Sequence, residues 1–208
     1  EIRLMDGNAF GCGVDVTQTA DVAAMAERVL AECGKIDILV NNAGGSAGLF
    51  GRLSRFRDAG EEVWSRVLDL NLHGTLRCIR AVLNPMIERR YGRIVSIASI
   101  AAAVGILDRV DYSAAKGGIV SLTKALAMEV GGYGVTVNSV SPGAIARRPT
   151  DSIPGGTYVG RMGTPEEVAS LVAFLASEEA AFITGCDYII DGGRVLGPAR
   201  SMETTQHN

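Results

Sequence analysis

Short apolar runs alternate with longer segments of helical periodicity along most of the sequence. Residues 36–40 form a nearly continuous apolar run, which is typical of a parallel strand covered on both faces. Similar runs lie at residues 94–98, 135–140 and 187–190. Because strands and helices alternate, the sequence predicts an α/β fold built on a doubly wound, Rossmann-like parallel sheet.

The segments between these runs carry helix signals. Residues 17–34 have apolar positions with a period near 3.6 residues, with Thr17 as the expected cap and Gly34 as the expected end. Further helices are expected at residues 61–89, with a kink or break at Pro85, at residues 111–130, and from Pro165 onward after Thr164. We therefore expect one domain over residues 1–197, with a polar, glycine-rich loop at residues 45–60 and a polar tail at residues 198–208.

Composition excludes several classes of function. The net charge of −3 and the scattered arginines form no basic stripe, so a nucleic-acid partner is not expected. No apolar run approaches the roughly 18 residues that a membrane span needs. The four cysteines are widely spaced and there are only two histidines, a pattern that disfavours a metal site and favours reduced thiols in a cytoplasmic protein.

Tyr112 and Lys116 are the strongest candidate catalytic residues. They lie four residues apart in an expected helix and therefore share one face. An ammonium group close to the phenol would lower the tyrosine pKa from about 10 and allow proton exchange near neutral pH. Taken alone, such a pair is more often an amphipathic pair with a snorkelling lysine. The surrounding motifs favour the catalytic interpretation.

Several polar motifs accompany this pair, most of them at the expected ends of strands. They are Asn41-Asn42-Ala43-Gly44, Asn71, Ser99, the segment from Asn138 to Gly143, Ile183-Thr184-Gly185 and Asp191-Gly192-Gly193. Singly each could be an ordinary turn, but together they resemble the short-chain dehydrogenase/reductase family over roughly residues 9 to 197. Within that family the resemblance is greatest to the carrier-protein-dependent 3-oxoacyl reductases.

The resemblance implies hydride transfer between the nicotinamide of NAD or NADP and a small-molecule carbonyl or secondary alcohol. Tyr112 would be the acid or base, and Ser99 would hydrogen-bond the reacting oxygen. Lys116 would stabilise the phenolate and reach the nicotinamide ribose, while Asn71 would hold a water that links the lysine to solvent. The helices expected at residues 61–89 and 112–130 would build a homotetramer or homodimer.

The resemblance also implies a set of cofactor-binding residues. Asp15 would contact the adenine edge, with Val16 beside it. Asn42, Ala43 and Gly44 would lie along the adenosine half of the cofactor, where small residues allow close approach of the backbone. The full set implied is Asp15, Val16, Asn42, Ala43, Gly44, Tyr112, Lys116, Pro142, Gly143 and Ile145. No metal ligand is implied.

The sequence departs from the family pattern at two places. Arg147 stands where the family commonly has a threonine that contacts the cofactor. The sequence also begins just ahead of the family's third strand, so the first two strands and the glycine-rich pyrophosphate turn are expected to be absent. In the family, the residues that distinguish NAD from NADP normally lie in that N-terminal segment. Two hypotheses follow: an oxidoreductase, or a noncatalytic homologue that acts as an assembly or binding protein.

The same departure predicts a bare sheet edge at residues 36–40. Three arrangements are open for the preceding apolar run, residues 9–16. It could pair with residues 36–40, it could pack without a strand ladder, or the sheet could be completed by polypeptide outside this sequence. The third is favoured, because a cofactor needs the pyrophosphate turn as well as the catalytic residues.

Overall fold

A parallel four-stranded sheet forms the centre of the molecule, in the order β1-β2-β3-β4. The computed structural model describes residues 7–51, 55–146, 148, 151 and 156–197. The strands are β1 (Ile38–Asn41), β2 (Gly92–Ile97), β3 (Val135–Pro142) and β4 (Asp187–Ile190). The α/β fold with a doubly wound parallel sheet is therefore confirmed.

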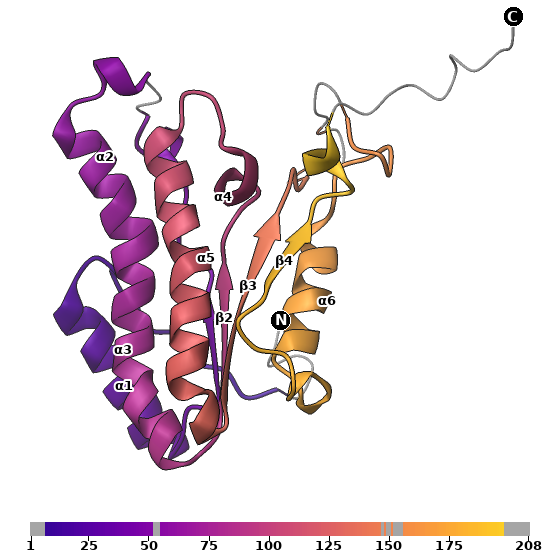
Figure 1. The fold of residues 1–208 in the computed structure, drawn as a ribbon. Coiled ribbons are helices and arrows are strands. Elements are labelled where there is room, and N and C mark those ends of the chain that lie inside the picture. Colours follow the sequence, from indigo (N-terminus) through magenta and orange to yellow (C-terminus); the bar gives the residue numbers. More distant parts are fainter. Residues whose placement is uncertain (1–6, 52–54, 147, 149–150, 152–155, 198–208) are drawn as a thin grey trace, which may run out of the picture.

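Helices cover both faces of the sheet (Figure 1). One face carries α1 (Thr19–Cys33), α2 (Glu61–Leu68), α3 (Gly74–Glu88) and α5 (Val110–Val130), and the other carries α6 (Pro165–Leu175). The short helix α4 (Ala101–Val104) follows β2. None of the helices in the described part of the chain has the length and apolarity that a membrane span requires.

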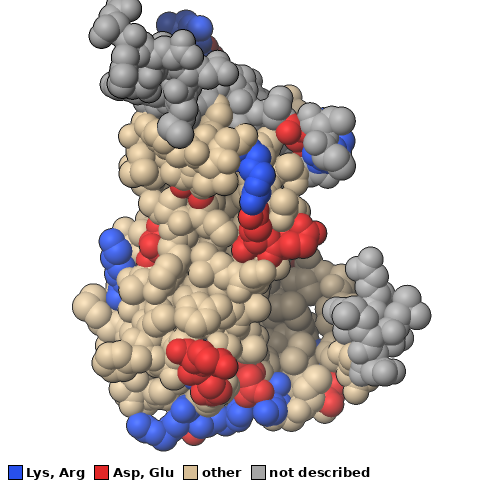
Figure 2. Space-filling view, turned by 90° about the vertical axis from the view of Figure 1, so that its right-hand side faces the viewer, with Lys and Arg blue, Asp and Glu red and all other residues tan. Residues whose placement is uncertain are grey.

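Two hydrophobic cores lie on the two faces of the sheet. Successive residues of a strand point to opposite faces, so Ile94 belongs to the core under α3 and α5, whereas Val95 belongs to the core under α6. Leu175 of α6 is fully buried against the second core. Between separate groups of charged side chains, uncharged residues form most of the surface on the α6 and β4 side (Figure 2).

Two helix signals behave as the sequence predicts. Gly34 ends α1 in the left-handed conformation, with its N–H bonded to the carbonyl of Leu30. Thr164 and Glu167 form a capping box at the start of α6, with Pro165 in the first turn. At the start of α1 the prediction is wrong: Gln18 takes the cap position, because the Thr17 hydroxyl donates to the Asp15 carboxylate instead.

The helix predicted over residues 61–89 does not break at Pro85, which lies inside α3 near its end. Its irregular point is a π-helical turn, Asp69–His73, between α2 and α3. There the Asn71 side chain donates to the Val67 carbonyl, and the Thr75 hydroxyl donates to the Asn71 carbonyl. These side chains occupy carbonyls of the helical ladder, and turns of this kind are frequent at functional sites.

Residues 9–16 form no strand, and within the described residues β1 pairs with β2 alone. The bare edge predicted for this strand is therefore found, with Ile38 47% and Val40 43% exposed. Pairing of residues 9–16 with residues 36–40 is therefore wrong, and within this sequence the segment packs without a ladder; completion of the sheet by polypeptide outside it stays a prediction. The segment is held by α1 instead: Arg28 lies 4.9 Å from the Phe10 ring centre and donates to the Gly11 carbonyl.

The core under α3 generates a stability prediction. Met86 of α3 is fully buried, whereas Met128 of α5 is 82% exposed. Met86→Ala should lower the free energy of unfolding by roughly 2–5 kcal/mol, because it removes buried contacts and leaves a cavity. Met128→Ala should change it by less than about 0.5 kcal/mol. Urea denaturation of both variants checks this, and equal losses would contradict the assignment of the core.

Candidate active site

A cavity of about 670 Å³ opens at the carboxyl ends of the strands. Ligands of doubly wound sheets bind at this edge, and the volume falls in the usual range for small-molecule sites. Six of the residues predicted from the sequence line the cavity: Asn42, Gly44, Tyr112, Lys116, Pro142 and Ile145. The opposite wall is apolar and comes from α6, through Pro165, Val168, Ala169, Val172, Ala173 and Ala176.

Lys116 is the most unusual residue that lines this cavity, because it is a lysine and yet is only 4% exposed. Its Nζ donates to the carbonyl oxygen of Ile97 at 2.7 Å. Burial lowers the pKa of Lys116 to about 8. An ammonium group has three N–H donors, so two remain for a ligand once Ile97 is satisfied.

Tyr112 lies one helical turn before Lys116, and the Lys116 Nζ is 5.6 Å from the centre of its ring. Both side chains line the cavity, as their spacing predicts. Burial raises the pKa of Tyr112, and a hydrogen bond with Ser99 and the charge of Arg109 act in the lowering direction. The prediction of a lowered Tyr112 pKa is wrong in this structure, because burial is the largest effect on this group and raises its pKa.

Ser99 is buried directly after β2, where its backbone begins the turn into α4. Its Oγ accepts a hydrogen bond from the N–H of Ala101 at 3.1 Å. This bond fixes the hydroxyl oxygen while the same group interacts with Tyr112. The structure thus brings Ser99, Tyr112 and Lys116 together from two elements of the fold.

Asn71 holds the turn that follows β1. Its Oδ1 accepts from the N–H of Gly45 at 3.0 Å, and its Nδ2 donates to the carbonyls of Gly45 at 2.8 Å and Val67 at 2.9 Å. A Cβ atom on Gly44 would lie 2.5 Å from the Asn71 Oδ1 and 3.3 Å from the Lys116 Nζ. The glycine is therefore required for the close approach of this turn to α5.

Of the residues predicted for the adenosine half, Asn42 and Gly44 line the main cavity, whereas Asp15, Val16 and Ala43 do not. Val16 and Ala43 line a neighbouring cavity of about 180 Å³, which Asn42 shares. Asp15 lines neither cavity. Its carboxylate accepts hydrogen bonds from the N–H and the hydroxyl of Thr17, and these bonds lower the Asp15 pKa.

Gly143 has a structural reason of its own to be glycine. Its N–H donates to the Ile190 carbonyl at 2.9 Å, and a Cβ atom would lie 2.6 Å from the Cβ of Asp191. Arg147, the predicted departure from the family pattern, lies outside the described residues.

Sequence reasoning missed two contributors to the site. The first is the α6 wall, whose signal is the pair Val168 and Val172 four residues apart on one helix face. The second is Arg109, whose charge acts on Tyr112. Its only signal is its position, three residues before the tyrosine and between Asp108 and Val110.

Comparisons with known proteins agree with this geometry. The family model described as enoyl-(acyl carrier protein) reductase matches residues 3–194. The short-chain reductase protein NovJ of Streptomyces niveus is 39% identical, over 93% of this chain and 77% of its own length. The 3-oxoacyl-[acyl-carrier-protein] reductases of Escherichia coli and Chlamydia muridarum are 38% and 40% identical, over 92% and 86% of this chain and 80% and 74% of their own lengths.

The close approach at Gly44 generates a second prediction. Gly44→Ala should lower the free energy of unfolding by roughly 1–3 kcal/mol, because the added methyl group must displace the buried Asn71 amide. Gly117→Ala is the matched control, since nothing lies within 4 Å of a Cβ at that helical position. It should leave stability unchanged or raise it slightly. Thermal and urea unfolding of the two variants check this, and a Gly44→Ala variant as stable as the wild type would contradict the close approach.

The buried amine generates a prediction about pH. The pKa of Lys116 is lower in the folded protein, at about 8, than its ordinary value of 10.5. The unfolded chain therefore holds this proton more tightly, and stability should rise as pH increases from about 8 to about 10. Lys116→Met removes this dependence, so the variant should be more stable than the wild type at pH 7 by up to on the order of 3 kcal/mol.

Urea denaturation of both proteins from pH 7 to pH 10 checks this prediction. The stability difference between the variant and the wild type should shrink as pH rises. A difference that stays constant across this range would show that the Lys116 amine is not desolvated.

Proposed function

Because the chain belongs to the short-chain dehydrogenase/reductase family and is an NAD(P)-dependent oxidoreductase, we propose that its main cavity is the site of hydride transfer to a small-molecule carbonyl. The observation that carries this proposal is the convergence of three groups. Tyr112 and Lys116 of α5 line one cavity with Gly44, and Ser99 reaches Tyr112 from the end of β2.

The residues of the cavity fit the nicotinamide-ribose half of such a cofactor. Lys116 has donors to spare for ribose hydroxyls, and Gly44 offers backbone without a side chain beside it. Asn42, Pro142 and Ile145 line the same space, and Gly143 directly follows Pro142 at the end of β3. Asp15, Val16 and Ala43 would contact the adenosine half of the cofactor. Val16 and Ala43 line the neighbouring cavity, into which that half would extend.

When bound, the cofactor would supply or accept the hydride. Tyr112 would donate its phenolic proton to the substrate oxygen during reduction and remove it during oxidation. Burial raises the pKa of Tyr112 and so keeps the phenol protonated at neutral pH, which is the form that reduction needs. Ser99 would donate a hydrogen bond to the same oxygen, and Lys116 would hold the nicotinamide ribose with the N–H donors that the Ile97 carbonyl does not occupy.

Asn71 would act by holding the Gly44–Gly45 turn against α5. The family's further role for this asparagine, the retention of a water near the lysine, is part of the proposal. Both NAD and NADP remain candidates for the cofactor, and a titration with each decides between them.

We propose a homotetramer or homodimer built on α2, α3 and α5. Exposed apolar side chains on the outer surfaces of two of these helices support it, namely Leu76 on α3 and Met128 on α5. A cytoplasmic location is proposed because all four cysteines are free thiols. The relatives reported above are named as reductases, so the comparisons give no support to a noncatalytic binding protein.

Tyr112→Phe tests the proposed chemistry directly. Turnover of a 3-oxoacyl thioester and of simple ketones should fall by roughly 10²- to 10⁴-fold, because the general acid is lost while the ring remains. Binding of NADH or NADPH, followed by fluorescence, should persist. The measurement is cofactor oxidation at 340 nm with each substrate.

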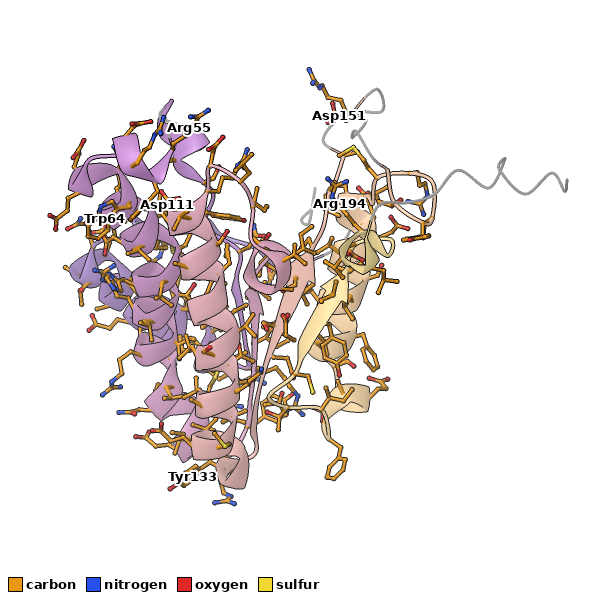
Figure 3. All side chains as sticks on the ribbon, turned by 45° about the horizontal axis from the view of Figure 1, so that its top comes forward. Arg55, Trp64, Asp111, Tyr133, Asp151 and Arg194 are labelled. Carbon is orange, nitrogen blue, oxygen red and sulfur yellow. The ribbon has the colours of Figure 1, made fainter. Side chains whose placement is uncertain are left out.

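Tyr133→Phe is the matched control, because Tyr133 is an exposed tyrosine beyond the far end of α5 from Asp111 (Figure 3). It should retain wild-type turnover. A Tyr112→Phe variant that keeps more than about a tenth of the wild-type rate would overturn the role assigned to the phenol.

A further inference from the structure

Arg109 immediately precedes α5, three residues before Tyr112. Its carbonyl accepts the N–H of Ser113 at 2.9 Å, and the Ser113 hydroxyl oxygen in turn accepts the N–H of Ile106 at 3.2 Å. These bonds tie the α4–α5 loop to the first turn of α5. The backbone of Arg109 therefore has a fixed position relative to the catalytic tyrosine.

The Arg109 guanidinium reaches across to the other loop beside Tyr112. Its Nη1 donates to the Oγ of Ser46 at 3.1 Å, and Ser46 follows the Gly44–Gly45 turn that Asn71 holds. The arginine is partly buried in this position. Two polar side chains from different loops thus meet, one just before the helix of Tyr112 and one just after the Gly44–Gly45 turn, and each can donate hydrogen bonds.

This arginine lacks a carboxylate partner among the residues that the structure describes. Of the two acids near it in the sequence, Asp111 accepts the N–H of Tyr112 at 2.7 Å, and Asp108 and Asp111 line a small separate pocket beside Val63 of α2. A partly buried guanidinium that keeps free N–H donors is a receptor for an anion. Its charge is also felt at the reacting centre, since it lowers the pKa of Tyr112 against the effect of burial.

Apart from Asp108, which is exposed, the rest of the same loop is apolar. Val104, Ile106 and Leu107 all expose their side chains there. An anionic group bound by Arg109 would therefore meet one cation, with Asp108 and hydrocarbon surface beside it. That combination suits a small organic acid with an apolar substituent better than a multiply charged ligand, which would need several cations.

We propose that Arg109 and Ser46 form a carboxylate subsite and that the substrate is a short oxo acid or the corresponding hydroxy acid. This inference rests on the proposed function, whose substrate class it narrows. The guanidinium would bind the carboxylate in bidentate fashion, with the Ser46 hydroxyl as a further donor. Since Arg109 stands three residues before Tyr112 and its charge acts on the phenol, the carboxylate and the reacting carbonyl would lie in one short substrate.

The reaction balances with the carboxylate unchanged. The carbonyl carbon would receive the hydride that a bound reduced cofactor supplies, and the carbonyl oxygen would take the proton of Tyr112. The products are a hydroxy acid, the oxidised cofactor and the tyrosine phenolate, which regains a proton from solvent.

A matched pair of substrates tests the subsite: 3-oxobutanoate and its neutral methyl ester, each with NADH and with NADPH. The wild type should prefer the acid in kcat/KM. Arg109→Gln should lower the preference for the acid over the ester by roughly 10- to 100-fold, mainly through KM, whereas Arg109→Lys should retain part of it. Arg28→Gln is the control, since Arg28 lies on α1 in an ion pair with Glu32, and it should leave the preference unchanged.

Two results would overturn the inference. In one, the wild type shows no preference for the acid. In the other, Arg109→Gln lowers activity on both substrates equally and shifts the pH profile, which would mean that the arginine acts only on the tyrosine.

A thermal-shift titration with 3-hydroxybutanoate distinguishes failure of the subsite from failure of the proposed function. Stabilisation that Arg109→Gln abolishes, without hydride transfer to either substrate, would support the subsite and refute the proposed function.

Discussion

The site depends on one buried charge, the Lys116 ammonium group. Burial lowers its pKa to about 8, and its hydrogen-bond acceptor within the described residues is the Ile97 carbonyl at 2.7 Å. A core would be more stable with an apolar side chain there, because burial of a charge is costly. The elements around it are arranged accordingly: β2 supplies the acceptor, α5 supplies the lysine, and the glycine turn after β1 closes over the amine.

That glycine turn explains why the π-helical turn Asp69–His73 interrupts the helical segment between α2 and α3. Asn71 reaches Gly45 from this turn while still bonding to the Val67 carbonyl of its own helix. In a regular helix, an asparagine side chain that bonds to the backbone would compete with the helical hydrogen bonds and would have no contact with Gly45 to compensate. The irregular turn, the buried amide and the absent side chain at Gly44 are therefore parts of one arrangement that brings β1 and α5 together.

The sequence predicted the layers of the fold well, because apolar runs such as residues 94–98 and caps such as Thr164 are local signals. It predicted that Tyr112 and Lys116 share a face, since that follows from helical spacing alone. It did not predict the π-helical turn, the capping by Gln18 or the direction of the Tyr112 pKa shift. These depend on which distant groups meet: at Tyr112, burial by residues from other elements outweighs the hydrogen bond with Ser99 and the charge of Arg109. Arg109 was missed for the same reason, because its partner Ser46 is 63 residues away in the sequence.

The central claim is that the cavity beside Lys116 is built for a nicotinamide cofactor. Fluorescence titration of the wild type with NADH and with NADPH, followed through energy transfer from the single tryptophan, Trp64, tests it most directly. The account predicts saturable binding of at least one of the two, weakened in Lys116→Met by the loss of the ribose donors. If neither cofactor binds, or if the Lys116→Met variant binds as tightly as the wild type, the cavity does not serve as the site described.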